Sequence, residues 1–179
     1  HTTRQCHQCP VDHFQDSTGA LSCTACLANS STLQLEASID ISACICDVGF
    51  QLSINAHLPV GRECEQCPAG FYRNTTETFA CVACPIDHYC PLGSIQPQAC
   101  PSHEFSDEGS TQNQDCECGP GRGRQEGTDG ACLKCPFATF APARHNAVCT
   151  LCPEHKNTSD VGSVTLAECL CVPGHGISG

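Results

Sequence analysis

Apolar side chains are sparse along this chain, and they do not gather into long runs. Only 33 of the 179 residues are Leu, Ile, Val or Phe, and Trp and Met are absent. A compact domain of this length normally buries a substantial core of such side chains. No apolar run approaches the roughly 18 residues that span a membrane as a helix. The pattern therefore predicts neither a large core nor a membrane span in this segment.

The short apolar stretches predict β-hairpins. Residues 47–52 and 69–73 are short mixed runs bounded by polar clusters, which is typical of strands in two-stranded hairpins. The 15 Gly and 12 Pro residues, together with the short intervals between cysteines, leave little room for helix. We expect small loops strung end to end, each contacting mainly its neighbours. The result would be an elongated rod with short β-hairpins and little helix.

Cysteine is the residue type that changes this picture. The chain has 20 cysteines, a density typical of a small disulfide-rich scaffold. Low apolar content and a net charge of −11 would also fit a disordered chain, but the regular cysteine spacing argues against disorder. Disulfides persist in oxidising compartments, so we expect an extracellular or cell-surface location. The eight Lys and Arg residues form no basic patch, and we therefore expect no nucleic-acid partner.

The cysteines mark three copies of one unit. Each copy has a Cys-x-x-Cys motif followed by Pro, a second Cys-x-x-Cys motif and then a Cys-x-Cys motif, and thirteen residues separate the first two motifs in every copy. The middle copy also contains an insertion with two extra cysteines, Cys90 and Cys100. We divide the chain into cysteine-rich repeats at residues 1–63, at residues 64–131 with the inserted pair, and at residues 132–179, the last being truncated.

An aromatic residue recurs at one offset from the cysteines. Five Cys-Pro motifs are followed by Phe or Tyr five residues after the cysteine. Proline fixes φ and starts a short extended run, so the ring can lie across the disulfide of its own loop. An ordinary exposed aromatic residue is the alternative. We expect packing on disulfides for Phe14, Tyr72, Tyr89, Phe105 and Phe140.

Three chemistries are open to paired Cys-x-x-Cys motifs. Four thiolates can bind zinc, but zinc ribbons usually separate the pairs by roughly 15–20 residues. Proline follows five of the six pairs and removes the backbone N–H that a zinc knuckle needs. A redox site needs an exposed thiolate of low pKa, typically at a helix N-terminus, and the sequence predicts no such helix. We expect disulfides, no metal or other cofactor, and no enzyme, because no residues supply a nucleophile with a base.

The simplest connectivity is a ladder, in which each cysteine that follows a short spacer pairs forward with the next cysteine. Closing a loop of about 15 residues contributes on the order of 3 kcal/mol through chain entropy, so sulfur and not apolar burial would hold the fold. The ladder gives Cys9–Cys23, Cys26–Cys44, Cys46–Cys64, Cys67–Cys81, Cys118–Cys132, Cys135–Cys149 and Cys152–Cys169.

The inserted cysteines leave part of the ladder open. Four cysteines can pair in three ways, and these are Cys84, Cys90, Cys100 and Cys116. Our working choice is Cys84–Cys90 with Cys100–Cys116.

Two cysteines have no partner in the ladder. Cys6 should pair backwards and Cys171 should pair forwards along a repeat array. One explanation is that the chain is a segment of a longer array. The other is that neighbouring subunits are cross-linked end to end through Cys6 and Cys171.

The repeat resembles the cysteine-rich repeats of ephrin-receptor ectodomains. The resemblance is carried by Cys-Glu-Gln-Cys-Pro-Ala-Gly-Phe at residues 64–71, Cys-Asp-Val-Gly-Phe at residues 46–50 and Cys-Glu-Cys-Gly-Pro-Gly at residues 116–121. It covers nearly the whole chain and implies EGF-like modules, loosely related to tumour necrosis factor receptor repeats. The insertion Cys-Pro-x3-Tyr-Cys-Pro at residues 84–91 resembles repeats of long protist surface proteins.

Two surface features remain. Three Asn-x-Ser/Thr sequons, at Asn29, Asn74 and Asn157, lie in loops between the expected bridges, so we expect N-linked glycans there. A Gly-Pro-Gly-Arg-Gly-Arg stretch at residues 119–124 lacks the Arg-Gly-Asp adhesion tripeptide. We expect a mobile turn in that stretch.

Two functions fit such a chain. The first is an extracellular structural or adhesive glycoprotein segment, a disulfide-stapled rod that acts as a spacer or filament building block, with protein partners that include copies of itself. The second is a receptor ectodomain stalk that binds a protein ligand, as the resemblance implies. The two unpaired cysteines and the lack of a large apolar or aromatic cluster favour the first.

Overall fold

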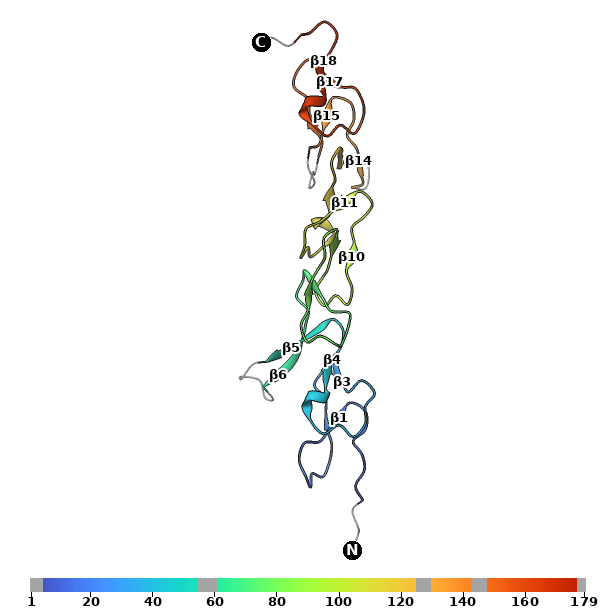
Figure 1. Cartoon of the computed structure of the whole chain (residues 1–179), viewed down its shortest axis with the longest axis vertical. Helices are drawn as coiled ribbons and strands as arrows, with labels where there is room; N and C mark the ends of the chain where they lie inside the picture. The colour runs from blue at the N-terminus through green and yellow to red at the C-terminus, as the bar shows by residue number, and fades with distance from the viewer. Residues whose placement is uncertain (1–4, 55–60, 125–129, 143–147, 177–179) are drawn as a thin grey trace. The chain divides into compact units, whose positions relative to one another are not determined.

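The computed structural model describes residues 5–54, 61–124, 130–142 and 148–176. Within these ranges the chain forms short strands and three 3₁₀ helices, with no α-helix (Figure 1). The named strands pair as nine antiparallel two-stranded sheets, and nine disulfides close the loops between them. The predicted fold class, a small disulfide-rich chain of tandem repeats with short β-hairpins and little helix, is confirmed.

The chain divides into two compact units. Residues 1–83 together with 91–96 form the first, and residues 84–90 together with 97–179 form the second. The boundaries of the three sequence repeats stay a prediction.

The first unit contains four hairpins and one 3₁₀ helix, η1. Its elements are β1 (His13–Phe14) with β2 (Thr24–Ala25), β3 (Ser30–Ser31) with β4 (Ile45–Cys46), β5 (Phe50–Ile54) with β6 (Arg62–Gln66), β7 (Phe71–Tyr72) with β8 (Val82–Ala83), and η1 (Ile41–Ala43).

The second unit contains five hairpins and two 3₁₀ helices. Its elements are β9 (His88–Tyr89) with β10 (Gln98–Ala99), β11 (Glu104–Phe105) with β12 (Glu117–Cys118), β13 (Arg122–Arg124) with β14 (Cys132–Lys134), β15 (Thr139–Phe140) with β16 (Thr150–Leu151), β17 (Lys156–Thr158) with β18 (Cys169–Cys171), η2 (Asn113–Asp115) and η3 (Leu166–Glu168).

The disulfides of the structure join the same cysteines that the ladder pairs, including the two bridges of the insertion. Their Cα atoms lie 5.4–5.8 Å apart, which is ordinary disulfide geometry. The bridges are Cys9–Cys23, Cys26–Cys44, Cys46–Cys64, Cys67–Cys81, Cys84–Cys90, Cys100–Cys116, Cys118–Cys132, Cys135–Cys149 and Cys152–Cys169.

One turn recurs at the start of the loops. The turn begins at the cysteine that opens each loop. The third residue after this cysteine has a positive φ, and the N–H of the fourth residue donates to the carbonyl of the first. Examples are the His13 N–H to Pro10 at 3.2 Å and the Phe71 N–H to Pro68 at 3.1 Å. The positive-φ residues are Asp12, Asn29, Gly49, Gly70, Asp87, Gly93, His103, Gly121, Ala138, His155 and Gly174.

This turn corrects two expectations from the sequence. The prolines open a turn and not an extended run. The strands predicted from residues 47 and 69 instead begin at Phe50 and Phe71, because the turn uses the first residues of each stretch. A residue with positive φ cannot continue a β-strand, whose φ is negative.

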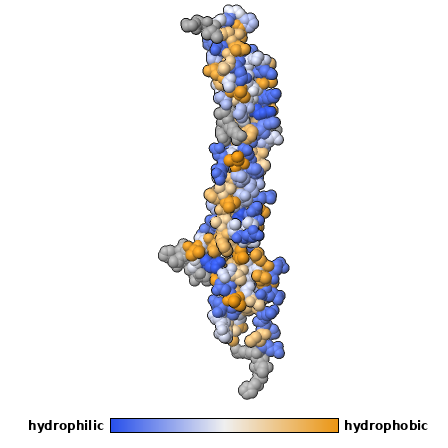
Figure 2. Space-filling view, in the orientation of Figure 1, coloured by the Kyte–Doolittle hydropathy of each residue, from blue (hydrophilic) through white to orange (hydrophobic). Residues whose placement is uncertain are grey.

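Cysteines form most of the interior of the described chain. The other apolar residues that are buried are Phe14, Phe140 and Ala141. Many large apolar residues stay exposed, and Figure 2 shows them interspersed with polar residues on the visible face. The scarcity of buried aliphatic side chains agrees with a fold held by sulfur.

Candidate functional site

Consecutive loops are joined by reciprocal backbone hydrogen bonds. In the second unit the Asp87 N–H donates to the Ser106 carbonyl at 3.0 Å and the Asp87 carbonyl accepts the Cys100 N–H at 2.9 Å. At two other junctions the same position is a glycine. In the first unit this is Gly49, the third residue after Cys46. Its N–H donates to the Arg73 carbonyl at 2.8 Å, and its carbonyl accepts the Cys67 N–H at 2.8 Å. A Cβ added at Gly49 would lie 2.8 Å from the Gly93 carbonyl oxygen. The glycine is therefore required by the close approach of the next loop.

A buried arginine reinforces this junction. Arg73 is only 1% exposed and is among the largest fully buried side chains. Its Nη1 donates to the carbonyls of Cys46, Asp47 and Phe50 at 2.8, 2.9 and 2.6 Å. Its Nε donates to the Thr78 carbonyl at 2.7 Å. Burial lowers the pKa of Arg73 below the ordinary guanidinium value, and the Asp47 carboxylate offsets part of this.

The second unit repeats the glycine junction without the arginine. The Gly121 N–H donates to the Ala141 carbonyl at 2.9 Å, and the Gly121 carbonyl accepts the Cys135 N–H at 2.9 Å. A Cβ at Gly121 would clash with the Gly162 carbonyl oxygen. Ala141, which is fully buried, stands at the position of Arg73, six residues after the cysteine.

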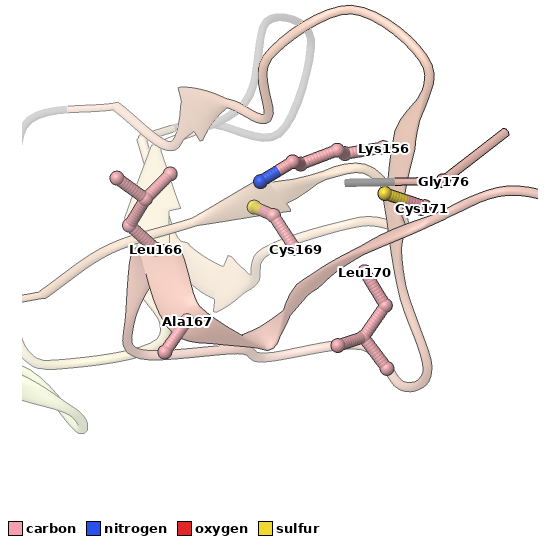
Figure 3. Close-up of a pocket in the computed structure, with 7 residues that line it drawn as sticks. All are labelled: Lys156, Leu166, Ala167, Cys169, Leu170, Cys171 and Gly176. Carbon is pink, nitrogen blue, oxygen red and sulfur yellow. The ribbon is translucent and has the colours of Figure 1, made fainter. Parts of the chain in front are cut away.

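Cys171 lies unpaired beside a groove of about 340 Å³ (Figure 3). In the register of β17 and β18, Cys171 stands opposite Lys156, and the two side chains lie side by side. The groove is also lined by Leu166 and Leu170. Cys46 and Cys118 have the same position in their hairpins, opposite Ser30 and Glu104, and both of those cysteines are bridged.

Cys6 is the second unpaired cysteine of the described residues, and it is exposed. It lies in the first unit beside a larger groove of about 860 Å³, which Gln15, His13 and Leu21 also line. Cys6 opens its Cys-x-x-Cys motif as Cys64 does, and Cys64 is bridged backwards to Cys46. Each unit therefore presents one thiol next to a groove.

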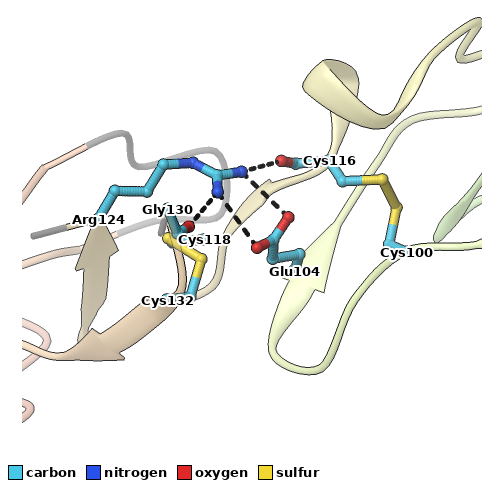
Figure 4. A network of polar contacts seen from close by, with 7 residues as sticks. All are labelled: Cys100, Glu104, Cys116, Cys118, Arg124, Gly130 and Cys132. Atoms are coloured by element: carbon cyan, nitrogen blue, oxygen red, sulfur yellow. Dashed lines mark hydrogen bonds and ion pairs between the residues drawn. A yellow bond between two sulfur atoms is a disulfide. The ribbon is translucent and has the colours of Figure 1, made fainter. Parts of the chain in front are cut away.

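An ion pair between a half-buried arginine and a buried glutamate links β11 to the hairpin of β13 and β14 (Figure 4). Arg124 and Glu104 form a bidentate pair, with Nη2 to Oε2 at 3.0 Å and Nη1 to Oε1 at 3.2 Å. The Arg124 guanidinium also donates to the carbonyls of Cys116, at 2.6 Å, and Gly130. The predicted turn at residues 119–124 is present only in its first part, where the Arg122 N–H donates to the Gly119 carbonyl. Residues 122–124 form β13, and Arg124 anchors this strand, so it is not a mobile turn.

The sequons lie on the surface. Asn29, Asn74 and Asn157 are all exposed. Asn29 takes the positive-φ position of its turn, and Asn157 lies in β17 opposite Leu170. These positions leave the side-chain amides open to modification, while occupancy by glycans stays a prediction.

The five recurring aromatic residues lie in short strands. Phe14 and Phe140 are buried, whereas Tyr72, Tyr89 and Phe105 are half-buried. Phe14, Tyr72 and Phe140 pair with Thr24, Val82 and Thr150, each the residue directly after a cysteine of the same loop. The strand pairing thus brings these rings near their bridges, and direct packing on the disulfides stays a prediction.

No metal site is visible in the part of the chain that the structure describes. No group of three or more His, Cys, Asp or Glu residues lies close enough there to hold a metal ion. The same ranges contain no helix of the length and apolarity that would cross a membrane.

Sequence reasoning missed the two arginines that organise the junctions. Arg73 stands where the other repeats have Gln15 and Ala141, so no repeated pattern marks it. Arg124 lies 20 residues from Glu104, and only the register of the hairpins brings them together. The only signal in the sequence is that each arginine lies inside a predicted disulfide loop, Arg73 between Cys67 and Cys81 and Arg124 between Cys118 and Cys132.

Comparison with known proteins agrees with this architecture. The family model of the tyrosine-protein kinase ephrin type A/B receptor-like repeats matches residues 1–44 and 123–169. The chain is 26% identical over 177 residues, 92% of its length, to Signal peptide, CUB and EGF-like domain-containing protein 2 of Mus musculus. It is 29% identical over 163 residues, 86% of its length, to Cysteine repeat modular protein A of Toxoplasma gondii.

A third relative is Ephrin type-A receptor 7 of Gallus gallus, at 28% identity over 100 residues, or 56% of the chain. The chain spans only 15%, 5% and 8% of the lengths of these three relatives. Cysteine-rich repeats of this kind are segments of large extracellular proteins and are typical of non-catalytic regions. The chain belongs to the ephrin type A/B receptor-like family of cysteine-rich repeats.

Proposed function

We propose that this chain is a structural segment of an extracellular protein, a disulfide-stapled spacer that can also serve as a filament building block. The observation that carries the proposal is the repeated junction at Gly49 and Gly121. The same pair of backbone hydrogen bonds recurs there between consecutive loops. A chain whose loops contact mainly their neighbours has the architecture of a spacer.

The absence of a reactive constellation supports the same role. Within the described ranges, the charged side chains that are well buried, Arg73 and Glu104, bind backbone carbonyls or each other. The hydrogen bonds that these two side chains make hold loops together, although Arg73 Nη2 has no partner in these ranges. This use of buried charge supports a structural role.

Small-angle scattering of the secreted, oxidised chain tests the proposal. A compact protein of this length has a radius of gyration of about 16 Å. We expect a clearly larger value for the monomer, and we expect it to persist under protease treatment that degrades the reduced and alkylated chain. A monomer with a radius near the compact value would contradict the spacer role.

N-linked glycans are part of the proposal. Asn29, Asn74 and Asn157 are exposed, and glycans there would keep the segment soluble and shielded from proteases. We expect at least two of the three to be occupied in material secreted from a eukaryotic cell. Enzymatic deglycosylation should lower the mass, and the three Asn→Gln variants assign the sites. An unchanged mass would refute this.

A receptor stalk is the second candidate, and the similarity to Ephrin type-A receptor 7 is the observation that favours it. Such a segment would bind a protein ligand along its surface. Surface-labelling of the native segment in its parent protein separates the two roles. Protection of one continuous patch by a different protein would support the stalk and weigh against a pure spacer.

A further inference from the structure

We propose that an N-linked glycan on Asn74 packs over an exposed apolar patch at the Gly49 junction and tightens the contact between the loops that meet there. We call this surface the junction patch, and it comprises Val48, Leu92 and Ile95. All of these residues belong to the first unit. The proposal rests on the N-linked glycans proposed above, and it gives one of them a contact and a role.

The junction patch is formed where two loops meet at Gly49. Val48 directly precedes Gly49, and Leu92 directly precedes Gly93, whose carbonyl oxygen would lie 2.8 Å from a Cβ at Gly49. The Cγ2 atom of Ile95 would lie 3.0 Å from the same Cβ. The Ile95 side chain therefore packs on the Gly49 backbone, whose N–H and carbonyl make the two hydrogen bonds of the junction.

The side chains of the junction patch are exposed although they lie at a contact between loops. Leu92 is 64% exposed, Ile95 52% and Val48 38%. Exposed apolar surface is unfavourable in water. Single exposed apolar side chains are ordinary, whereas several at one place indicate a surface that another group covers.

Asn74 places a sequon next to this patch. The Gly49 N–H donates to the carbonyl of Arg73, which directly precedes Asn74, at 2.8 Å. The Arg73 N–H donates to the carbonyl of Ser94, which directly precedes Ile95, at 3.1 Å. Asn74 and Ile95 thus each follow one partner of the same hydrogen bond, and both adjoin Gly49.

The Asn74 side chain is available for modification. Asn74 is exposed, and within the described residues its side chain makes no hydrogen bond. The first N-acetylglucosamine is bonded to the amide nitrogen of the asparagine, so it lies one short side chain away from the backbone beside Ile95. The C–H groups on a face of this sugar ring can cover an aliphatic side chain while its hydroxyl groups stay in water.

The junction of the second unit carries the same kind of patch. Pro120 precedes Gly121 and is exposed, and Val161 precedes Gly162. The Cγ1 atom of Val164 would lie 3.2 Å from a Cβ at Gly121. Apolar residues therefore occupy the same three positions at both junctions.

The second patch has no sequon beside it. Pro142 stands at the position of Asn74, seven residues after the cysteine that opens its loop, and proline cannot carry an N-linked glycan. Val161 and Val164 are each 37% exposed, less than their counterparts in the junction patch. The sequon thus accompanies the more exposed of the two patches, which favours the glycan as the group that covers it.

A glycan in this position would resist opening of the junction. It is attached to the loop between Cys67 and Cys81 and would pack on Ile95 and Val48, which belong to the two segments on either side of Gly49. Separating these segments would return the covered apolar surface to water. The Arg73 guanidinium holds the junction from its buried side, and the glycan would hold it from the exposed side.

Native-state hydrogen exchange of the secreted, glycosylated chain tests the proposal. In Asn74→Gln the Gly49 and Cys67 amides should exchange about fivefold faster, the effect of returning roughly 40 Å² of apolar surface to water. The amides of the Gly121 junction should be unchanged. Asn157→Gln removes a different sequon and is the matched control, because it should leave the Gly49 and Cys67 amides unchanged.

A double-mutant cycle identifies the residue that the glycan covers. In an Ile95→Ala chain, Asn74→Gln should change exchange at Gly49 by less than about twofold, because the apolar partner of the glycan is gone. In an Ile54→Ala chain the same substitution should keep its full effect, since Ile54 is exposed but lies outside the junction patch. Nuclear Overhauser contacts between the first N-acetylglucosamine and the Ile95 methyl groups should report the packing directly.

Three outcomes would overturn the proposal. They are an Asn74 that is unmodified in the secreted chain, equal exchange at Gly49 with and without the Asn74 glycan, and an effect of Asn74→Gln that persists in the Ile95→Ala chain. An unmodified Asn74 with glycans on the other two sequons would leave the wider glycan prediction standing. The spacer role is decided separately by the radius of gyration, which none of these measurements uses.

Discussion

The Arg73→Ala substitution probes how much of the junction between loops depends on side chains. The Arg73 guanidinium donates hydrogen bonds to four backbone carbonyls. Three of them belong to the segment from Cys46 to Phe50, and the fourth belongs to Thr78. All nine disulfides stay intact in this variant. The experiment therefore separates the stability of closed loops from the attachment of one loop to the next.

The magnitude follows from the burial of the group. Hydrogen bonds to a charged group stabilise by about 1.5–3 kcal/mol each, but burying the guanidinium costs several kcal/mol. Removing one partner from such a buried network typically costs about 3–5 kcal/mol. We take about 3 kcal/mol as the loss for local opening of the Gly49 junction. That corresponds to roughly a hundredfold in the opening equilibrium.

Native-state hydrogen exchange measures this loss directly, since local opening sets the rate at each amide. The Gly49 and Cys67 amides, which form the junction, should exchange about a hundredfold faster in Arg73→Ala. The Gly121 and Cys135 amides of the other junction should be unchanged. Arg122→Ala is the control. Within the described residues the Arg122 side chain donates one hydrogen bond, to the Cys132 carbonyl at 3.1 Å, and its loss should change exchange less than about tenfold.

Exchange at Gly49 and Cys67 that stays within about twofold of the unmodified chain would refute the reasoning. It would mean that the disulfides and the two backbone hydrogen bonds hold the junction without the guanidinium.

Two further predictions concern the second unit. Glu104→Gln removes the charge in β11 that pairs with Arg124 of β13 (Figure 4) and should destabilise the chain by about 1–3 kcal/mol in denaturant unfolding. Glu108→Gln, at an exposed site, should change stability by less than about 0.5 kcal/mol, and equal effects would contradict the role of the pair. The pKa of Asp115 is lowered from 3.8, first by the hydrogen bond from the Thr111 N–H. This carboxylate therefore stabilises η2 above its ordinary pKa, and the stabilisation is lost as pH falls through the folded value. Titration of the Thr111 amide resonance should show that acid transition, and Asp115→Asn should abolish it.

The sequence is informative where the interactions are local. The bridges follow from the spacing of cysteines, because each joins neighbours along the chain, separated by 6 to 18 residues. Strand starts at Phe50 and Phe71 were missed, since the positive-φ turn before them is occupied in other loops by residues as different as Asp12 and His155. No single residue type marks that turn.

The arginine contacts lie beyond local reasoning for a different reason. Arg73 donates to backbone carbonyls of the preceding loop. Every residue has such a carbonyl, so the sequence does not indicate which ones need a side-chain donor. Arg124 finds Glu104 only after two hairpins have formed in register. The stretch that contains Arg124 is rich in glycine and suggested mobility. In the structure those glycines instead allow close approach, as at Gly121 and Gly123.

Disulfides alone do not explain a spacer. Each bridge closes one loop, and a closed loop can still pivot about the residues that connect it to the next. The direction of the following loop is set by the paired hydrogen bonds at Gly49 and Gly121, where a methyl group would displace the neighbour. A substitution at either glycine should therefore alter the geometry of the chain while every disulfide still forms. Correct cysteine pairing measured by mass would not reveal that change, whereas amide exchange at the junctions would.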